Sequence, residues 1–477
     1  MIDQRKKMVQ RGDIIDVTVE TTGLEGKSIA RHEGLVVFVE GAVPGDHVKV
    51  QILRTKKKHA EAKIVEITVP SPHRTTPRCS HFGMCGGCSW QHADYIFQCG
   101  QKENHVREAL EHIGGIYNVP VLPIIPVEDP FFYRNKLEFS FGDKRWLTNE
   151  EASQGVDATV PLALGFHAPQ LYDKIISVDE CYLQSPVSNR ILNFVRRYAL
   201  ENNLPPYSLG LETGYLRNLV IREGKNTGEI MVNLVTFDDR PEVMKELTAA
   251  LLGEIPEITT VINNVNTRKS NVAVGDFEKI YHGNGTISDR IGDKTFQISA
   301  NSFFQTNTRQ AERLYQVTKE FAATTPDDLV YDLYCGTGTI SIFIADSVRK
   351  VIGIDIVESS IANAKANAEL NGCSNCEFIA GDLKDLLTKQ TGWMAQNFPP
   401  DVLIIDPPRS GMHPKAVEEL GRMKIARIVY VSCNPATLAR DAKMLLPFGY
   451  QIEKVQPVDM FPHTNHVESV AQLHLHT

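Results

Sequence analysis

The stretch VYDLYCGTGTIS, residues 330–341, decides the fold of this chain. A short apolar run comes first, two glycines follow at Gly336 and Gly338, and a segment of helical character begins directly after them. Where a strand is followed by a glycine turn and then by a helix, the backbone of the turn can come close to a ligand at the carboxyl edge of the sheet. A dinucleotide fingerprint would have a third glycine where this chain has Ser341, so a NAD-dependent oxidoreductase is disfavoured.

Outward from this stretch, apolar strands alternate with helical segments from about residue 328 to the C-terminus. The segments are LVYDLYCGTG (329–338), KVIGIDI (350–356), SSIANAKANAELNG (359–372), CEFIAGD (376–382), DVLIIDPP (401–408) and RIVYVSC (427–433). Strands that alternate with helices of ten or more residues predict a parallel, doubly wound α/β sheet.

Three acidic residues follow the predicted strands of this sheet. Asp355 ends the second strand, where a carboxylate accepts hydrogen bonds from the two hydroxyls of a ribose, and Asp382 follows the third, where an adenine edge could lie. Either carboxylate could instead cap a helix. Asp406 ends the fourth strand, and the two prolines after it form a rigid turn that could hold a substrate base or simply end the strand.

Cys433 ends the fifth strand in VYVSCNPAT and lies just before a predicted helix. A helix N-terminus stabilises a thiolate, so we expect a reactive cysteine at the same edge as the glycines, although a buried packing cysteine is the alternative. MFPHTNHVESV, residues 460–470, adds His463, His466 and Glu468. A thiolate can add to a substrate as a covalent nucleophile, and a carboxylate such as Glu468 can act as a general base that removes a proton. The histidines could orient the loop or be structural.

The N-terminal segment has a different character. Residues 12–69 contain short β-branched runs separated by Gly, Pro and Asp, which predicts a small β-barrel, and a proline-rich linker follows at 70–78. Residues 1–78 hold 14 Lys and Arg against 10 Asp and Glu, a local charge of +4, although the whole chain carries −8. A basic module on an acidic body is compatible with RNA binding. A helix is expected at 95–113 and mixed strands at 120–290.

The nine cysteines must be sorted by spacing, because we expect a cytoplasmic protein without disulfides. RCSHFGMCGGCSWQH places Cys79, Cys85 and Cys88 close together, and Cys181 is the best candidate for a fourth ligand. Four thiolates suit either zinc or an iron–sulfur cluster, and the spacing does not separate these. We expect Cys373 and Cys376 to bind no metal, and Cys99 and Cys335 to be packing residues.

The motifs DLYCGTG (332–338), DPPRSG (406–411), SCNP (432–435) and HTNHVE (463–468), in this order, resemble the RNA uracil-5 methyltransferase family. The resemblance implies that Cys433 is the nucleophile and Glu468 the base. Phe303, Phe304 and Gln305 match the family's FFQ segment, whose glutamine contacts the methyl donor S-adenosylmethionine. The residues expected to bind this donor are Gln305, Tyr334, Gly336, Asp355, Asp382 and Asp406. Many relatives have Glu at the position of Asp355. The shorter aspartate side chain should still reach the ribose, so only the geometry of this contact differs.

The N-terminal barrel resembles a TRAM domain, so Arg54, Lys56, Lys57 and Lys58 would contact phosphates. Family members with this barrel hold a 4Fe-4S cluster on the same cysteine pattern, which implies that Cys79, Cys85, Cys88 and Cys181 are its ligands. The combination points to the members that modify 23S ribosomal RNA, because relatives acting on transfer RNA often lack both features.

Three domains are therefore expected: an oligonucleotide-binding-type TRAM barrel at 1–72, the iron–sulfur segment with a mixed α+β RNA-binding domain at 73–290, and a Rossmann-like α/β catalytic domain at 291–477. We expect a monomer without membrane contact that flips the target uridine into a pocket between Asp406, Cys433 and Glu468. Two other hypotheses are a transfer RNA enzyme of the same family and a non-catalytic RNA-binding assembly factor.

Overall fold

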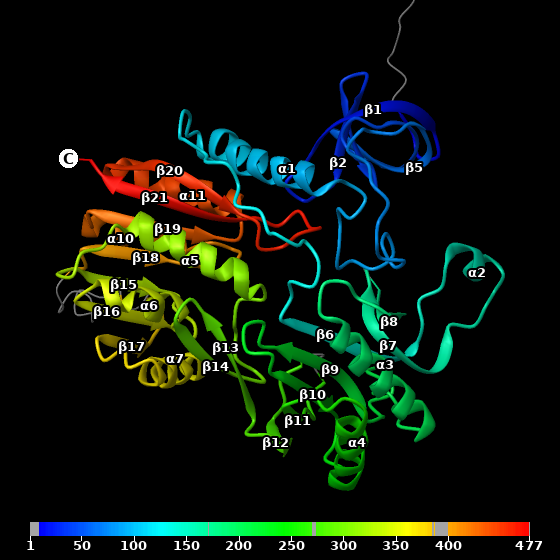
Figure 1. The fold of residues 1–477 in the computed structure, drawn as a ribbon. Coiled ribbons are helices and arrows are strands. Elements are labelled where there is room, and N and C mark those ends of the chain that lie inside the picture. Colours follow the sequence, from blue (N-terminus) through cyan, green and yellow to red (C-terminus); the bar gives the residue numbers. More distant parts are fainter. Residues whose placement is uncertain (1–8, 170, 270–272, 384–385, 387–398, 477) are drawn as a thin grey trace, which may run out of the picture. The chain divides into compact units, whose positions relative to one another are not determined.

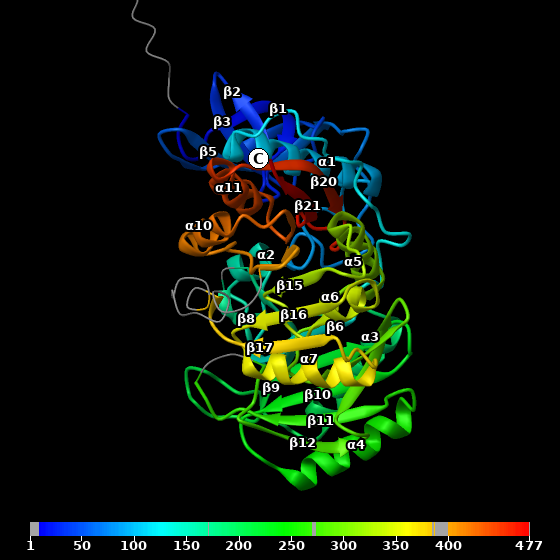
Figure 2. The ribbon, with the colours of Figure 1, turned by 90° about the vertical axis from the view of Figure 1, so that its left-hand side faces the viewer.

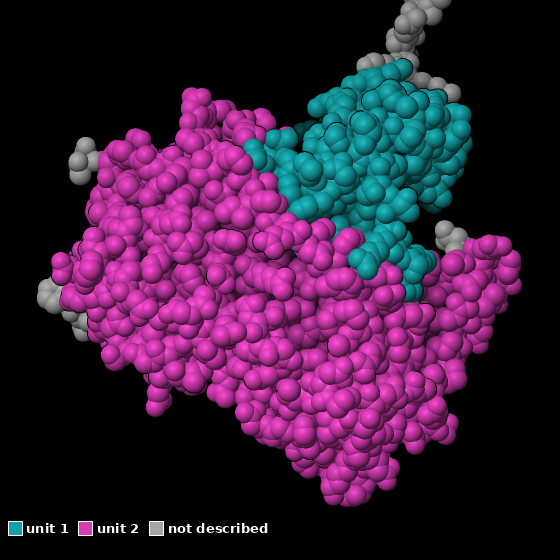
Figure 3. All heavy atoms as spheres, viewed as in Figure 1, with its two compact units in different colours: residues 1–105, 461–466 teal, residues 106–460, 467–477 magenta. Residues whose placement is uncertain are grey.

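The computed structural model describes residues 9–169, 171–269, 273–383, 386 and 399–476. The chain divides into two compact units, shown in different colours in Figure 3. Unit 1 comprises residues 1–105 together with 461–466, and unit 2 comprises 106–460 and 467–477. The path of the chain therefore leaves unit 1, builds most of unit 2, returns to unit 1 for six residues, and ends in unit 2. The three expected domains remain a proposal.

Unit 1 contains the predicted barrel, which closes in the strand order β1-β2-β3-β5-β4. The strands are β1 (Ile14–Thr22), β2 (Ser28–His32), β3 (Leu35–Glu40), β4 (His47–Thr55) and β5 (His59–Val69). Alternate residues such as Val17, Val19, Val48 and Val50 are buried, so the period of two in the sequence fills a core inside the barrel. Of the predicted basic residues, Arg54 lies near the end of β4 and Lys56, Lys57 and Lys58 form the turn between β4 and β5, and all four are exposed.

The predicted helix after the cysteines is present. It consists of α1 (Tyr95–Glu108) and continues as a π-helical segment, η1 (Ala109–Gly114). Gly115 ends it in a left-handed conformation (φ 67°), which glycine adopts without strain. No helix among the described residues is long and apolar enough to cross a membrane.

The first half of unit 2 is a seven-stranded sheet in the order β12-β11-β10-β9-β6-β7-β8, with three helices, followed by the hairpin β13-β14. The elements are β6 (Lys136–Lys144), α2 (Asn149–Ser153), β7 (Thr159–Ala168), β8 (Leu171–Ser177), α3 (Pro186–Glu201), β9 (Leu216–Glu223), β10 (Ile230–Thr236), α4 (Pro241–Glu254), β11 (Thr260–Val265), β12 (Phe277–His282), β13 (Thr286–Ile291) and β14 (Lys294–Ser299). This mixed architecture confirms the mixed strand and helix pattern predicted for the middle of the chain.

The second half of unit 2 is the predicted doubly wound sheet, in the order β17-β16-β15-β18-β19-β21-β20 (Figure 1). Its strands are β15 (Leu329–Leu333), β16 (Lys350–Asp355), β17 (Cys376–Ala380), β18 (Val402–Ile405), β19 (Arg427–Ser432), β20 (Tyr450–Val458) and β21 (Glu468–Leu475), and its helices are α5 (Thr308–Ala322), α6 (Thr339–Ile344), α7 (Glu358–Leu370), α10 (Pro414–Met423) and α11 (Pro435–Leu445). The first five strands are parallel, and β21 pairs antiparallel with both β19 and β20. Figure 2 shows β15, β16 and β17 side by side with α7 beside them.

Both faces of this sheet are covered by helices. Leu403, Ile405, Ile428 and Tyr430 pack in one buried cluster with residues of η1, α10 and α11. The side chain of Asp332 points to the opposite face of the sheet, because successive residues of β15 alternate between the two faces. There it accepts a hydrogen bond from a residue of α6. Because all the parallel strands end at one edge, their loops gather there, and this edge positions the candidate site.

Candidate active site

The glycine turn after β15 adopts the backbone conformation that its sequence requires. Tyr334, Gly336 and Gly338 have φ values of 64°, 54° and 75°. A Cβ atom added at Gly338 would lie 2.8 Å from the Phe378 ring, whereas one at Gly336 would meet nothing within 4 Å. Gly338 is therefore needed for packing, and the space in front of Gly336 is open to a ligand.

Asp355 lies beside this turn, as predicted from its place at the end of β16. Its carboxylate accepts hydrogen bonds from the backbone N–H of Gly336 (3.0 Å) and of Val357 (2.8 Å). Each carboxylate oxygen has a further lone pair, so the group can still accept from ribose hydroxyls. Asp382 is exposed after β17. The open turn and this carboxylate fit the ribose of a nucleoside such as S-adenosylmethionine.

The segment carrying Gln305 is held next to the same turn. The hydroxyl of Thr337 donates to the carbonyl of Phe303 (3.2 Å), and the side-chain amide of Asn135 donates to the carbonyl of Gln305 (2.7 Å). The side chain of Asn307 then caps α5 and donates to the carbonyl of Met460 (3.1 Å). These contacts place the predicted donor-binding glutamine beside the glycine turn.

The acidic residue before the turn, Asp332, was not predicted as a site residue. It is fully buried, and the hydroxyl of Ser341 donates to it at 2.6 Å. Burial raises the pKa of Asp332 to about 7, and the nearby carboxylates of Asp406 and Asp355 add to the effect. Ser341, which stands where a dinucleotide fingerprint has glycine, is thus a partner of this buried carboxyl group. An acidic residue inside an apolar strand was the signal in the sequence.

Replacing Asp332 by asparagine is expected to remove a pH-dependent loss of stability. An unfolded Asp ionises near pH 3.8, whereas the folded group holds its proton up to about pH 7, so the folded protein loses stability as pH rises through this range. When the pH is raised from 5 to 8, the free energy of unfolding of the wild type should fall by about 3 kcal/mol more than that of Asp332→Asn. Denaturant unfolding at the two pH values measures this difference. The exposed Asp327→Asn serves as control, and equal slopes for Asp332→Asn and wild type would contradict the expectation.

The loop after β18 contains Asp406 and is tied to the start of α11. The side-chain amide of Asn434 donates to the carbonyl of Arg409 (3.0 Å), and Arg440 donates to the carbonyls of Ser410 and Met412, both at 3.1 Å. Burial raises the pKa of Asp406 to about 7, so near neutral pH this carboxyl group can either donate or accept a hydrogen bond. These hydrogen bonds hold the loop in one conformation, in which Asp406 could contact the polar edge of a substrate base.

Cys433 lies between β19 and α11, as predicted, but the expected stabilisation of its thiolate is wrong. Burial, Glu468 and Asp406 raise the pKa of the Cys433 thiol to about 12. Only Arg409 and a backbone hydrogen bond act in the opposite direction. The two neighbouring acids and desolvation outweigh the helix N-terminus, so Cys433 is a neutral thiol in this state.

Glu468 comes to the same edge because β21 runs antiparallel to β19. The first residue of β21 therefore lies near the end of β19, with Ser469 paired to Ser432. Glu468 is buried (5% exposed), and burial together with Asp406 raises the pKa of its carboxyl group well above the ordinary value. The electrostatic coupling of Glu468, Asp406 and Cys433 shows that three residues predicted for one pocket lie close together.

The two histidines of the HTNH segment belong to unit 1. The backbone carbonyl of His463 accepts hydrogen bonds from the N–H groups of Ser89 (2.8 Å) and Trp90 (2.9 Å), and Gln98 contacts both its N–H and its ring. His463 has a positive φ of 65°. Within unit 1 its contacts fix the segment after the cysteines, which favours the structural alternative for this residue.

The predicted metal-binding cysteines are divided between the units. Cys79, Cys85 and Cys88 lie in one loop of unit 1, where the N–H of Gly87 donates to the sulfur of Cys85 (3.4 Å) and Gln91 donates to the sulfur of Cys88 (3.3 Å). Cys79 raises the pKa of the Cys85 thiol, after burial as the larger cause. Among the described residues no group of three or more His, Cys, Asp or Glu is arranged to hold a metal ion.

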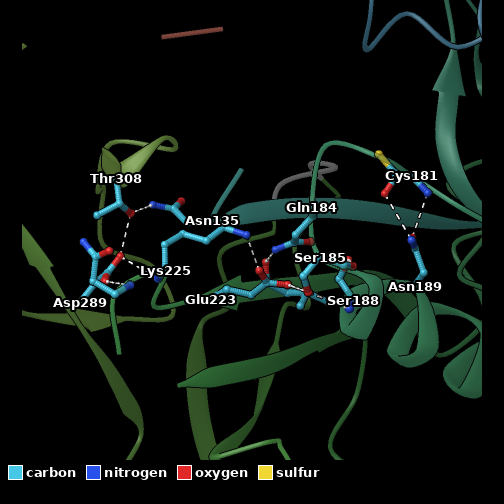
Figure 4. Close-up of polar contacts among 12 residues, drawn as sticks. Asn135, Cys181, Gln184, Ser185, Ser188, Asn189, Glu223, Lys225, Asp289 and Thr308 are labelled. Carbon is cyan, nitrogen blue, oxygen red and sulfur yellow. Dashed lines mark hydrogen bonds and ion pairs between the residues drawn. The ribbon is translucent and has the colours of Figure 1, made fainter. Parts of the chain in front are cut away.

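Cys181 belongs to unit 2 and is buried before α3. Its backbone N–H donates to the side chain of Asn189 (2.9 Å), and the Asn189 amide donates back to its carbonyl (3.3 Å). Figure 4 shows its sulfur pointing away from this pair of hydrogen bonds. The loop sulfurs with their N–H donors are a donor set that suits a soft metal centre.

Cys99 and Cys335, the two cysteines expected to be packing residues, agree with that expectation. Cys99, Cys335 and Cys373 are buried. The thiol of Cys376 donates to the carbonyl of Ser341 (3.8 Å), and burial raises its pKa to about 12, with Cys373 as the next cause.

The chain is similar to known proteins along nearly its whole length. Residues 278–475 match the family model described as tRNA (Uracil-5-)-methyltransferase, and residues 8–65 match the TRAM domain. An uncharacterized RNA methyltransferase of Chlorobaculum tepidum is 44% identical over 474 residues, which cover 98% of both chains. Another from Bacteroides thetaiotaomicron is 45% identical over 455 residues, covering 94% of this chain and 99% of the relative.

A solved structure also resembles nearly the whole chain. It is the tRNA (uracil-54, C5)-methyltransferase of Pyrococcus abyssi in complex with S-adenosyl-L-homocysteine, at a TM-score of 0.74 and 30% sequence identity. The match covers 96% of this chain and 100% of that one.

Proposed function

Because this chain belongs to the RNA (uracil-5-)-methyltransferase family and uses S-adenosylmethionine, we propose that it methylates uracil through a covalent bond between Cys433 and carbon C6. The observation that carries this proposal is the convergence of Cys433, Glu468 and Asp406 at the edge that also bears the glycine turn. A nucleophile, a base and a donor site are the three components that the reaction requires.

The reaction begins with transfer of the Cys433 proton to solvent water, which can reach this half-buried side chain. The thiol pKa of about 12 means that the free protein holds little thiolate, so binding of the RNA must favour ionisation, with Arg409 as the positive charge that assists. The sulfur then bonds to C6 of uracil, the C5–C6 double bond opens, and the electron pair becomes available at C5. A flipped-out base is required, because neither face of C6 is accessible within a stack.

Bound S-adenosylmethionine would supply an electrophilic methyl group: the bond from the methyl group to the sulfonium sulfur would break as C5 forms its new bond, and S-adenosylhomocysteine would be the leaving group. Glu468 then takes the proton from C5, the C5–C6 double bond re-forms, and the bond between C6 and the cysteine sulfur breaks. A carboxylate with a raised pKa is a stronger base, so the buried position of Glu468 matches it to this step. We propose that Asp406, with a pKa of about 7, hydrogen-bonds the polar edge of the uracil ring.

We propose 23S ribosomal RNA as the substrate, on the combination of barrel, cysteine loop and catalytic domain. A uridine in transfer RNA is the second candidate, because the Pyrococcus abyssi enzyme acts on tRNA and matches 96% of this chain. That coverage includes the barrel region, so the barrel alone does not separate the two substrates. Exposed Lys56, Lys57 and Lys58 would contact phosphates in either RNA.

The substrate is tested by mapping 5-methyluridine in ribosomal and transfer RNA from cells with and without the gene. Mass spectrometry of nuclease fragments should show the loss of the modification at a position in 23S RNA, and the purified protein should restore it with S-adenosylmethionine. Loss confined to transfer RNA would select the second candidate. No loss in either RNA, together with no transfer in vitro, would favour the non-catalytic assembly factor.

We also propose a 4Fe-4S cluster on Cys79, Cys85, Cys88 and Cys181. The donors to the loop sulfurs support it, since N–H groups commonly hydrogen-bond cluster sulfurs. Anaerobically purified protein should contain iron and labile sulfide and absorb broadly in the visible range, and Cys85→Ser should lose most of both. Cys376→Ser, outside the loop, should retain them. If the protein instead contained one zinc ion per chain and no iron, the cluster assignment would be wrong and a zinc site, which the cysteine spacing also allows, would take its place.

A further inference from the structure

A cavity adjoins the elements that hold the predicted donor-binding glutamine. It has a volume of about 650 Å³, within the range of ligand sites. Its walls come from the segment 125–133, from the turn between β9 and β10, and from the first turns of α5. None of Cys433, Glu468 or Asp406 lines it, so it is distinct from the site described above.

One wall of the cavity is aromatic. Phe131, Phe132 and Tyr133 line it, and Tyr182 makes edge contacts with the first two rings at 6.4 and 6.2 Å. Phe132 has a positive φ of 54°, which is costly for a bulky side chain. Its N–H donates to the carbonyl of Tyr182 (2.7 Å), which helps to hold this conformation. Strain of this kind is characteristic of functional positions.

The opposite wall is polar and carries charges of both signs, because Glu312 lies on it beside the basic residues, and Glu128 and Asp129 line the cavity from the segment 125–133. Arg309 and Arg313 are exposed and lie one turn apart near the N-terminus of α5, and Lys225 and Asn226 come from the turn after β9. Asp289 fixes this turn against α5, because it accepts the N–H groups of Lys225 (3.0 Å) and Asn226 (2.8 Å) and the hydroxyl of Thr308 (2.7 Å; Figure 4). Two guanidinium groups on a fixed helix end suit a phosphate.

The cavity is connected to the catalytic edge by a short chain of contacts. Asn307, which lines it, is two residues from Gln305, a distance of at most about 7 Å along the backbone. Gln310, also in the lining, donates to the carbonyls of Ile125 (3.3 Å) and Asp459 (3.0 Å). Asp459 lies nine residues before Glu468 on the segment that leads to it. A strand of RNA with its target base at the catalytic edge could therefore place a neighbouring nucleotide here.

We propose that this cavity binds one unstacked nucleotide near the target uridine in the same RNA. The base stacks on the aromatic wall of Phe131 and Phe132, and its phosphate lies between Arg309 and Arg313. Aromatic stacking and Arg–phosphate contacts are the two interactions by which proteins hold single-stranded RNA. This inference rests on the proposed function, since it supposes an RNA whose target base is flipped out.

The test compares methylation by wild type, Phe131→Ala and the double variant Arg309→Ala/Arg313→Ala. The probe is total RNA from cells lacking the gene, with radiolabelled S-adenosylmethionine. Phe131→Ala should raise the half-saturating RNA concentration by roughly five- to hundredfold, the usual effect of losing one stacked base. The arginine variant should bind RNA more weakly. The slope of the logarithm of its RNA association constant against the logarithm of the salt concentration should become less steep by roughly 0.7 for each phosphate that the protein no longer neutralises. The half-saturating donor concentration should stay unchanged in both.

Lys319→Ala, in the last turn of the same helix, is the matched control and should behave as wild type. If wild type methylates the RNA and both cavity variants have its half-saturating RNA concentration within twofold, the cavity does not bind a nucleotide. The arginine variant changes only exposed side chains, so it decides the question even if Phe131→Ala fails to fold. If wild type transfers no methyl group to the RNA, the proposed function is wrong and this inference falls with it.

Discussion

Cys433→Ala is expected to abolish methyl transfer and to remove the covalent complex with RNA that carries 5-fluorouridine. Fluorine at C5 cannot leave as a proton, so the wild type should be trapped with its sulfur bonded to C6. Removing a catalytic nucleophile lowers turnover by more than about a thousandfold. Denaturing gel electrophoresis of labelled RNA measures the adduct, and donor binding measured by calorimetry shows whether the fold is intact.

The matched control for this prediction is Cys376→Ser. Burial raises the pKa of both Cys376 and Cys433 to about 12, but Cys376 begins β17 at the opposite end of its strand from the catalytic edge. This variant should form the adduct as wild type does. An adduct that persists in Cys433→Ala would assign the nucleophile to another residue and overturn the mechanism.

Glu468→Gln is expected to stop the reaction after methyl transfer. The amide keeps the size of the side chain but cannot take the C5 proton, so the methylated base should stay bonded to Cys433 even with natural uridine. Glu468 also raises the pKa of the Cys433 thiol, so the variant should form the thiolate more readily. Turnover should fall by about 10²- to 10⁴-fold, while a stable protein–RNA species that carries labelled methyl accumulates.

Glu453→Gln, an exposed carboxylate on β20 that pairs with His476 at 2.9 Å, is the control and should turn over normally. If Glu468→Gln releases methylated RNA at the wild-type rate, another group removes the proton. If it forms no covalent species although it binds donor and RNA, Glu468 acts before the addition rather than after it.

Much of the fold followed from the sequence because its patterns are local. The alternation of strands and helices after residue 328 predicted the parallel sheet, and the period of two in residues 12–69 predicted the closed barrel. The return of β21 beside β19, which brings Glu468 to the catalytic edge, depends on long-range pairing. The family resemblance, and not the local pattern, indicated where this residue belongs.

The candidate site was predicted in part, and its missing features depend on burial. The sequence indicated Cys433, Glu468, Asp406 and Asp355, but it suggested a stabilised thiolate because a helix follows the cysteine. Burial of the thiol, together with two buried acids that approach from other strands, reverses this effect, and no local pattern shows that packing. Asp332 and the cavity next to Asn307 were missed for the same reason, since each forms only when distant segments pack.

The six residues Phe461–His466, which the chain contributes to unit 1 between β20 and β21, have a consequence for biosynthesis. Asn465 donates to the carbonyl of Leu24 (3.0 Å), and Lys102 donates to the carbonyl of Phe461 (2.9 Å), so residues before 106 are completed by residues that are translated much later. If unit 1 folded during translation, it would lack these contacts until residues 461–466 had been synthesised. A chain truncated after residue 105 would therefore lack the hydrogen bonds that Phe461 and Asn465 make within unit 1.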